Sequence, residues 1–597
     1  MNATAVVLKF GSSVLADRHC LPRVVHEIYR YYRRGHHVLA AVSAIGNETD
    51  RLLGEARYWS NPPAPEPAVA ELLATGERQS AALLCMALER AGVQAGLLSP
   101  AGIKLTLSGE RLDAWPTSVD TRAIRQAFQL SPVLVLPGFA GVHETGGTAL
   151  MGRGGTDLTA VFLAQALGAA ECRLVKDVDG IYERDPALGV SGIRERRPHR
   201  YGRITYEEAL RISGKLVQPK AIEYLRDRKY RARVAALLQA EGTEIGGASN
   251  SVCDLPAAAP CKVLLLGLGQ IGQGVYQRLQ SLGEHFEVSG ILVRDKHRSR
   301  DVAVADGLLT TDVEELLKRP HQLIIDVCSD ASIARHAIET GLAAGSPAVT
   351  ASKRLVAEHG PALTRLAARH GTRIHYAAAV GGAAPMLETL ERALEHGPIT
   401  RLRGVLNGTC NFVIDQLAQG VAFHTAVSQA RSRGFAEANV SRDLHGDDSA
   451  DKLRILARLA FGAESDAVPI CREGLSPAES ARFGSAQAND AVLRQVATFD
   501  PVHGASVKLE SLAPDDYLAG ASGEENRLII GGARGREWRV HGKGAGRWPT
   551  AEAVIADVLD IRAWLEASAS QRSRPSSSVS PRRRRNAASA CGNLRPA

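Results

Sequence analysis

The sequence predicts an α/β protein made of two successive units, and two patterns carry this prediction. In the middle of the chain, the apolar run of residues 261–266 is too short for a helix and leads into a Gly-x-Gly-x-x-Gly motif, which a helical pattern follows. In the first half, short apolar runs such as residues 6–10 and 38–43 alternate with helical patterns. The two units are expected to join near residue 250.

The glycine motif predicts the opening of a dinucleotide-binding, or Rossmann, fold. Gly267 permits a tight turn, Gly269 lets a pyrophosphate approach the backbone, and Gly272 lets the helix pack on the strand. The helical pattern of residues 275–282 follows, and the N-terminus of that helix offers amide donors and the positive end of a dipole. Gln270 and Ile271, inside the motif, are further candidate cofactor contacts. A glycine triplet alone is a weak signal, but the strand before it and the helix after it favour a cofactor site.

The end of the next expected strand bears on the choice of cofactor. Residues 288–293 lead into Arg294-Asp295-Lys296-His297-Arg298, a basic cluster that suits the 2′-phosphate of NADP(H). Asp295 could instead accept hydrogen bonds from a ribose hydroxyl, which keeps NAD(H) as an alternative. Ser329 follows a further strand, residues 322–327, and joins Arg294 as a candidate cofactor contact.

Composition and charge argue against several functions. Of the net charge of +8 over 597 residues, the segment 567–597 supplies +7 through seven arginines and no acid, so the rest is nearly neutral. A basic face for nucleic acid is therefore not expected. No apolar run reaches the length of a membrane span, the first residues do not resemble a signal peptide, and nine scattered cysteines form no CxxC pair. We expect a cytoplasmic protein that binds neither nucleic acid nor membranes.

Four stretches of the first half carry candidate site residues. They are Lys9-Phe10-Gly11-Ser12-Ser13, Thr75-Gly76-Glu77-Arg78, Gly152-Arg153-Gly154-Gly155-Thr156-Asp157, and Lys176-Asp177-Val178-Asp179-Gly180-Ile181-Tyr182. Singly, each can be explained by turn chemistry or by an acid in the first turn of a helix. Residues 21–37, which mix Arg, His and Tyr, are expected to form a surface helix with one buried face rather than a nucleic-acid patch.

In this order, and together with Ser43 and Gly214-Lys215, these stretches resemble the aspartate kinases of the amino-acid kinase superfamily over residues 4–246. The resemblance implies an α/β sandwich that transfers a phosphoryl group from ATP, with Mg²⁺, to L-aspartate. It places Lys9 and Lys215 at the phosphates and Asp157 where it orients these lysines.

The same resemblance implies how the substrates are held. Arg153 would bind the α-carboxylate of aspartate in a forked pair, and Glu77 would bind its ammonium group. The remaining contacts are Ser12, Ser13 and Ser43 in the substrate pocket, and Lys176, Asp177 and Tyr182 at the nucleotide.

Two departures from that family leave alternatives. Gly11-Ser12-Ser13-Val14 stands where the family usually has Gly-Gly-Thr-Ser and also resembles glutamate 5-kinases, and Ala187 replaces a common basic residue after Asp-Pro. The alternatives are a kinase that acts on glutamate, and a catalytically inactive kinase-fold scaffold fused to an active second half.

The second half resembles the homoserine dehydrogenases. The matching blocks are Ala378-Ala379-Val380-Gly381-Gly382-Ala383-Ala384-Pro385, Leu406-Asn407-Gly408-Thr409-Cys410-Asn411, Gly434-Phe435-Ala436-Glu437, residues 443–453 and residues 542–552. The resemblance implies reduction of aspartate 4-semialdehyde to homoserine with NADP(H) or NAD(H), by a Rossmann domain followed by an α+β substrate and dimerisation domain. Both families imply a homodimer or a homotetramer.

Site residues of this half also follow from the resemblance. Lys452 would donate the proton and Asp448 would position it. Lys353 would contact cofactor and substrate, Glu437 the substrate ammonium, and Asp443 with Thr409 the remaining polar groups. Backbone carbonyls near Val380 and Gly382 could bind Na⁺ or K⁺, although Ala377 stands where the family often carries an acid.

The expected domain organisation has six parts. They are a kinase domain (1–246), a linker (247–260), a cofactor domain (261–377), a substrate and dimerisation domain (378–540), a helix that returns to the cofactor domain (541–566) and a disordered Ser/Arg-rich tail (567–597). Fused aspartate kinase–homoserine dehydrogenases carry regulatory ACT domains between their halves, and so short a linker has no room for them. We therefore expect no inhibition by threonine through that route.

Overall fold

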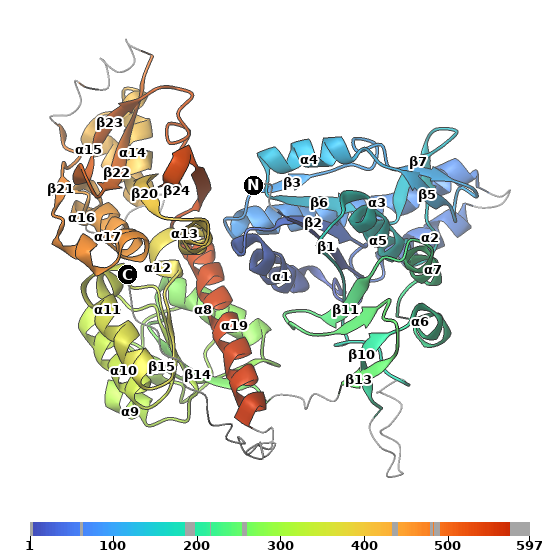
Figure 1. Cartoon of the computed structure of the whole chain (residues 1–597), viewed down its shortest axis with the longest axis horizontal. Helices are drawn as coiled ribbons and strands as arrows, with labels where there is room; N and C mark the ends of the chain where they lie inside the picture. Colours follow the sequence, from blue (N-terminus) through green and yellow to red (C-terminus); the bar gives the residue numbers. More distant parts are fainter. Residues whose placement is uncertain are drawn as a thin grey trace, which may run out of the picture.

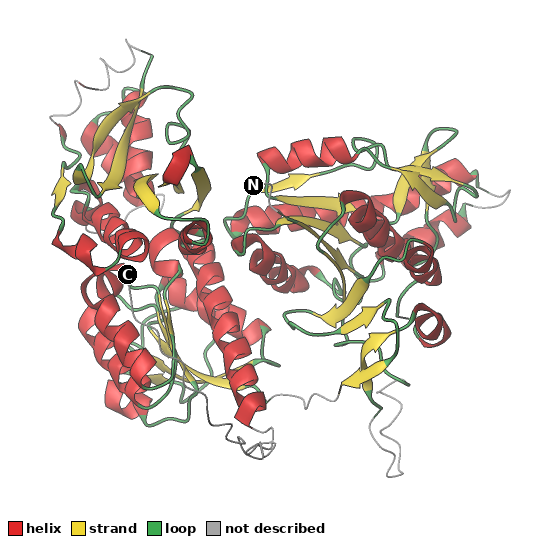
Figure 2. Ribbon diagram, in the orientation of Figure 1, coloured by secondary structure: helices red, strands yellow, loops and turns green. Residues whose placement is uncertain are grey.

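The structure is a computed structural model, and it describes residues 4–59, 64–184, 198–214, 216–253, 259–432, 440–477, 482 and 490–572. Figure 1 shows two bodies side by side, with the long helix α19 (Arg547–Arg572) of one facing helix α1 (Leu21–Arg33) of the other. Both bodies mix helices and strands, as Figure 2 shows. The expected α/β class is confirmed.

The first body is built on a sheet in which nine of the described strands follow the order β13-β10-β12-β11-β9-β1-β2-β6-β3. Their bounds are β1 (Ala5–Phe10), β2 (His37–Val42), β3 (Ala95–Leu97), β6 (Val133–Pro137), β9 (Glu171–Lys176), β10 (Arg200–Ile204), β11 (Ala232–Ala236), β12 (Thr243–Ile245) and β13 (Ser251–Cys253). Strand β1 pairs in parallel with both β2 and β9, so the carboxyl ends of these three strands share one edge.

Helices cover both faces of this sheet. Along β1, Val6, Leu8 and Phe10 pack with α1 and α3 (Glu66–Arg90), whereas Val7 packs on the opposite side with α5 (Gly155–Leu167). Since side chains alternate along a strand, Lys9 also points toward α5. The other helices of this body are α2 (Glu48–Tyr58), α4 (Thr121–Leu130), α6 (Tyr206–Ile212) and α7 (Pro219–Asp227). A small second sheet contains β4 (Thr106–Ser108), β5 (Trp115–Ser118), β7 (Ala140–His143) and β8 (Thr148–Leu150).

The second body begins with a parallel sheet in the order β16-β15-β14-β17-β18-β19. Its strands are β14 (Cys261–Leu266), β15 (Phe286–Leu292), β16 (Leu309–Thr310), β17 (Leu323–Asp326), β18 (Ala348–Thr350) and β19 (Ile374–His375), and its helices are α8 (Gln270–Ser281), α9 (Val313–Leu317), α10 (Ala331–Ala343) and α11 (Lys353–Arg369). Val263 and Leu265 pack with α8 and α19, while Leu264 and Leu266 pack with α9 and α10. Burial on both faces explains why residues 263–266 of β14 are all apolar.

The other sheet of the second body, mostly antiparallel, follows the order β21-β23-β22-β20-β24-β25. Its strands are β20 (Ile399–Val405), β21 (Ile470–Arg472), β22 (Val492–Asp500), β23 (Gly504–Leu512), β24 (Glu525–Gly532) and β25 (Glu537–Lys543), and its helices are α12 (Ala378–Gly381), α13 (Met386–Leu394), α14 (Gly408–Ala418), α15 (Phe423–Ser432), α16 (Ser441–Leu444) and α17 (Asp447–Phe461). Helix α19 then packs against α8 of the parallel sheet.

Three elements differ from the sequence expectations. Strand β13, inside the expected linker, pairs with β10; its sequence gives little signal because Val252 is half exposed. The returning helix begins at Arg547, after β25, and continues to Arg572, which includes the start of the expected tail; residues 573–597 lie outside the described residues. Helix α1 is more than a surface helix with one apolar face, because its polar side chains His26, Glu27 and Arg33 are buried as well.

Candidate active sites

In the first body, one buried carboxylate holds two lysines at the carboxyl edge of the sheet. Asp157, in the first turn of α5, lies 2.8 Å from Lys9 Nζ at the end of β1 and 3.0 Å from Lys176 Nζ at the end of β9. The backbone N–H of Gln218 donates a further hydrogen bond to Asp157. The second lysine is therefore Lys176, which the sequence placed at the nucleotide, while the expected second partner, Lys215, lies outside the described residues.

Burial and mutual attraction set the charges of this cluster. Burial lowers the pKa of Lys9 to about 8, against the attraction of Asp157. Burial would raise the pKa of Asp157, but Lys176 and Lys9 outweigh it and lower that pKa to about 2. Near neutral pH the cluster therefore carries a net positive charge at the sheet edge, which suits a phosphate group.

The expected substrate residues of this body differ in burial and in their contacts. Ser43 Oγ donates to Thr156 Oγ1 at 3.0 Å, and the N–H of Ala44 donates to Glu77, whose pKa burial raises to about 7. Arg153, in contrast, points into solvent with its side chain 89% exposed and pairs with Asp50.

The remaining expected contacts of this body lie at its surface or in local turns. Ser12, Ser13 and Asp177 are exposed at the ends of β1 and β9. Tyr182 lies in the turn after β9, where its hydroxyl donates to Asp179 at 2.7 Å. These side chains are accessible to a ligand approaching the sheet edge.

In the second body, the glycine loop after β14 has the shape that a pyrophosphate requires. Gly267 has φ +96°, and a Cβ there would lie 2.9 Å from the backbone of Cys328. A Cβ at Gly272 would lie 2.2 Å from the carbonyl oxygen of Gly267, so the helix approaches the strand closely. A Cβ at Gly269 would meet nothing within 4 Å, which leaves the front of the loop open. Helix α8 begins at Gln270, earlier than the helical pattern of residues 275–282 indicates, so Gln270 and Ile271 form its first turn.

The basic cluster after β15 lies beside this loop. Arg294 Nη2 donates to Ser329 Oγ at 2.8 Å, which joins the ends of β15 and β17. Asp295 instead accepts a hydrogen bond from the N–H of His297 at 2.8 Å, so its carboxylate closes a local turn. Of these two neighbours, Arg294 links the ends of two strands and Asp295 is engaged with its own backbone.

A second lysine–aspartate–lysine cluster joins the parallel sheet to α17. Asp448 lies 2.6 Å from Lys353 Nζ, which begins α11 after β18, and 3.0 Å from Lys452 Nζ one helical turn away. Lys452 Nζ also donates to the carbonyl oxygen of Leu406. Burial opposes ionisation of Asp448, but Lys353 and Lys452 lower its pKa well below the usual range, whereas burial lowers the pKa of Lys452.

Asn407 connects this cluster to Asp443, and sequence reasoning gave it no role. Its amide donates to Asp443 at 2.8 Å and to Asp448 at 3.0 Å, while its side-chain oxygen caps α14 at Cys410. An Asn directly before a helical pattern is an N-cap signal that could have singled it out. Burial and Asp448 raise the pKa of Asp443, and Thr409 bonds to its carboxylate. Glu437 lies outside the described residues.

The backbone expected to bind Na⁺ or K⁺ lies in and directly after α12. Val380 is buried among the side chains of α13 and α17, and Gly382 packs against Lys543 and Gly544. Among the described residues, no three His, Cys, Asp or Glu side chains gather as metal ligands. None of the described helices is long and apolar enough to cross a membrane.

Lys353 lies at the same carboxyl edge of the parallel sheet as the glycine loop, because β14, β17 and β18 run in parallel. A Rossmann sheet whose nucleotide edge meets a buried lysine and two carboxylates defines a nucleotide-dependent dehydrogenase.

Comparison with known proteins specifies this class. Family models match residues 4–236 (amino acid kinase family), 267–377 (homoserine dehydrogenase, NAD binding domain) and 385–559 (homoserine dehydrogenase). The homoserine dehydrogenase of Synechocystis sp. is 31% identical over 50% of this chain and 73% of its own length. That of Bacillus subtilis is 30% identical over 50% and 72%. A crystal structure of a homoserine dehydrogenase from Thiobacillus denitrificans matches with 29% identity and a TM-score of 0.47, over 52% of this chain and 74% of that one.

The chain belongs to the homoserine dehydrogenase family and carries an amino acid kinase domain ahead of its NAD-binding and catalytic domains.

Proposed function

We propose that this protein is a bifunctional enzyme of amino-acid biosynthesis. Its dehydrogenase half reduces L-aspartate 4-semialdehyde to L-homoserine, and its kinase half phosphorylates L-aspartate with ATP and Mg²⁺. The observation that carries the first activity is the bond between Lys353, at the nucleotide edge of the Rossmann sheet, and Asp448, which also holds Lys452. Cofactor residues and proton-transfer residues thereby meet at one place.

Each dehydrogenase residue has a distinct task. Bound at the glycine loop, NADPH or NADH would supply the hydride. Lys452 donates a proton from Nζ to the aldehyde oxygen as the alkoxide forms, and its lowered pKa makes it a stronger acid near neutral pH. Asp448 fixes the direction of this ammonium group, while Asp443 and Thr409 bind the polar end of the substrate.

The position of Arg294 supports NADPH as the preferred cofactor. Its guanidinium group lies at Ser329, where it can bind a 2′-phosphate, whereas the carboxylate of Asp295 is bonded to the N–H of His297. A ribose hydroxyl would have to compete for that carboxylate.

The kinase half is proposed on the cluster of Lys9, Asp157 and Lys176. Two ammonium groups fixed by one carboxylate can stabilise the charge that moves from ATP when a carboxylate oxygen of aspartate attacks the γ-phosphorus and ADP leaves. Glu77, buried on α3, can bind the substrate ammonium once it is ionised.

Two assays on the purified full chain test these activities separately. Oxidation of NADPH by aspartate semialdehyde tests the dehydrogenase, and absence of turnover with both NADPH and NADH would refute it. Incubation with ATP, Mg²⁺ and aspartate, with hydroxylamine to trap the acyl phosphate, tests the kinase, with glutamate in a parallel reaction. A product with glutamate alone would change the substrate, and no product with either would leave an inactive kinase-fold scaffold.

A further inference from the structure

The kinase domain and the dehydrogenase share one continuous core where α1 meets α19. Ala383, which follows α12, and Ala556 of α19 belong to the same buried cluster as Val24, Ile28 and Tyr29 of α1. At the end of α3, a Cβ on Gly92 would lie 2.8 Å from the Cβ of Ala383. The two domains therefore share an apolar core that has no room for a methyl group at Gly92. Such close packing of apolar side chains is typical of a permanent interface.

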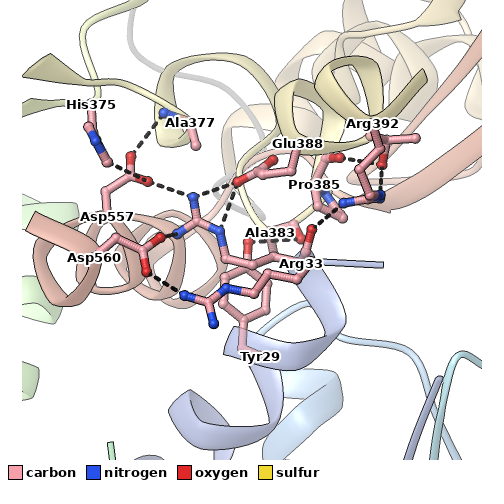
Figure 3. A network of polar contacts seen from close by, with 12 residues as sticks. Tyr29, Arg33, His375, Ala377, Ala383, Pro385, Glu388, Arg392, Asp557 and Asp560 are labelled. Carbon is pink, nitrogen blue, oxygen red and sulfur yellow. Dashed lines mark hydrogen bonds and ion pairs between the residues drawn. The ribbon is translucent and has the colours of Figure 1, made fainter. Parts of the chain in front are cut away.

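A buried ionic network reinforces this interface, and Figure 3 shows it from close by. Arg33 of α1, with its side chain 7% exposed, lies 2.6 Å from Glu388 of α13 and 2.7 Å from Asp557 of α19. Arg392 donates to the carbonyl oxygen of Arg33 at 2.8 Å, and His26 pairs with Glu552. One arginine of the kinase domain thus holds acids from two separate dehydrogenase helices.

The same contacts tie both ends of the segment 377–383 to α1. At its start, the N–H of Ala377 donates to Asp557 at 2.9 Å, and the other oxygen of Asp557 is the one that Arg33 binds. At its end, the hydroxyl of Tyr29 donates to the carbonyl oxygen of Ala383 at 3.2 Å. Between these ties lies α12.

Helix α12 in turn packs on the elements that carry the dehydrogenase cluster. It contacts α17, which bears Asp448 and Lys452, and α11, which begins at Lys353. Ala379 and Val380 share a buried cluster with Leu453 and with Leu406, whose carbonyl accepts the bond from Lys452. Because close-packed cores transmit displacements, a shift of the segment 377–383 would move both Lys452 and the carbonyl group of Leu406 that accepts its hydrogen bond.

We propose that helix α1 of the amino acid kinase domain positions the segment 377–383 of the dehydrogenase, with Tyr29 and Arg33 as positioning residues for dehydrogenase turnover. This inference rests on the dehydrogenase half of the proposed function. The kinase domain is then a structural part of the second active site, whatever its own activity.

The test uses full-length Tyr29→Phe, Arg33→Met and Arg33→Lys, with Arg34→Ala as the matched control. Arg34 directly follows Arg33 at the C-terminal end of α1 and also pairs with an acid of α19, Asp560, but its side chain is 53% exposed. For each variant, kcat and KM of the dehydrogenase, the Kd of NADPH by fluorescence and the melting temperature are measured. Dehydrogenase turnover of the wild-type protein is measured first. Its absence would refute the proposed function, whereas the variants test the positioning role alone.

The expected result is a fall in kcat of about tenfold or more for Arg33→Met and of about threefold for Tyr29→Phe, which loses a single hydrogen bond. Arg33→Lys should recover part of the loss, and Arg34→Ala should match the wild type. The Kd of NADPH should stay within about twofold, because none of the bonds of Tyr29 and Arg33 described above reaches the cofactor residues.

Two outcomes would overturn the inference. One is a folded Arg33→Met protein with wild-type kcat, and the other is a parallel loss of kcat and NADPH affinity, which marks general loosening rather than positioning. If Arg33→Met does not fold, Tyr29→Phe decides, because it removes one oxygen atom only and an unchanged kcat there also refutes the proposal.

Discussion

The two candidate sites use the same three groups in different geometries. In the kinase domain, Lys9 and Lys176 come from neighbouring strands and both are buried, with 6% and 7% of their side chains exposed. In the dehydrogenase, Lys452 is 3% exposed, one helical turn from Asp448, whereas Lys353 is 38% exposed at the sheet edge. Solvent is therefore excluded from both lysines of the kinase site. In the dehydrogenase site, solvent is excluded from Lys452 but reaches Lys353.

This difference indicates what each carboxylate does. Two equally buried lysines that share one carboxylate hold their ammonium groups in fixed positions, which suits the phosphates of a nucleotide. A buried lysine paired with an exposed one separates two tasks, because the buried group is tuned as an acid while the exposed group remains within reach of ligands. The four predictions below test this contrast, from the largest expected effect to the smallest.

Lys452→Met should break the dehydrogenase site most severely. The substitution removes the proton donor and keeps the volume of the side chain, so we expect kcat for semialdehyde reduction to fall about 10²–10⁴-fold. The kinase reaction, followed by hydroxylamine trapping, should be unchanged in the same protein. A loss of less than about tenfold would show that another group donates the proton.

Asp157→Asn should destabilise the protein more than Asp448→Asn. The first change leaves two buried lysines without a counter-charge, which costs about 3–5 kcal/mol, whereas after the second change the more exposed Lys353 can be rehydrated. Urea unfolding at pH 7 measures both losses, and equal losses would contradict the contrast. Because the pKa of Asp157 is lowered to about 2, its stabilising effect should be complete above about pH 4 and lost as the pH falls toward 2.

Glu77→Gln should remove a pH dependence of the kinase domain. The pKa of Glu77 is raised to about 7, so the folded protein keeps this proton while the unfolded chain loses it, and stability declines as the pH rises from about 4.5 to 7. We therefore compare the free energy of unfolding of the variant with that of the wild type at two pH values. The variant should be more stable relative to the wild type at pH 8 than at pH 4, by up to about 3 kcal/mol. Unfolding at both pH values measures this, and equal differences would refute it.

The wild-type enzyme offers a companion measurement on the same carboxylate. Its KM for aspartate should fall as the pH rises through 7, because only ionised Glu77 pairs with the substrate ammonium. In Glu77→Gln this step should be absent.

Arg294→Ala should have the smallest effect and should affect one cofactor only. Loss of a charge-assisted contact to the 2′-phosphate should raise KM for NADPH about tenfold, while KM for NADH changes less than about twofold. Lys318→Ala, an exposed lysine at the end of α9 and outside the basic cluster, serves as the control. Equal changes for both cofactors would mean that Arg294 supports the loop rather than the phosphate.

Local sequence patterns were sufficient for much of the fold and for part of the sites. The glycine loop after β14 and the lysines at strand ends follow from short motifs, because parallel strands bring their carboxyl ends to one edge. The second lysine that pairs with Asp157 did not follow from these patterns. Lys9 faces Leu174 across the strand pair, which puts Lys176 on the side of α5, and this register is not encoded by any short stretch.

The environment of α1 was the least predictable feature. Its polar residues resembled a solvated face, as expected for a helix of alternating apolar and charged positions. Their acidic partners Glu388, Glu552 and Asp557 lie more than 350 residues further along the chain. No period or motif connects positions so distant, so only tertiary structure distinguishes Arg33, which is buried, from Arg34, which is not.

The pairing of His26 with Glu552 has a consequence for biosynthesis of the protein. The two residues are 526 positions apart, so at usual rates of translation about 25–100 s separate their appearance from the ribosome. During that interval α1 presents the side chains of His26 and Arg33 without the acids of α19 that pair with them. Until α19 docks, the core that α1 shares with Ala383 and Ala556 is therefore incomplete, and its apolar side chains are exposed to aggregation.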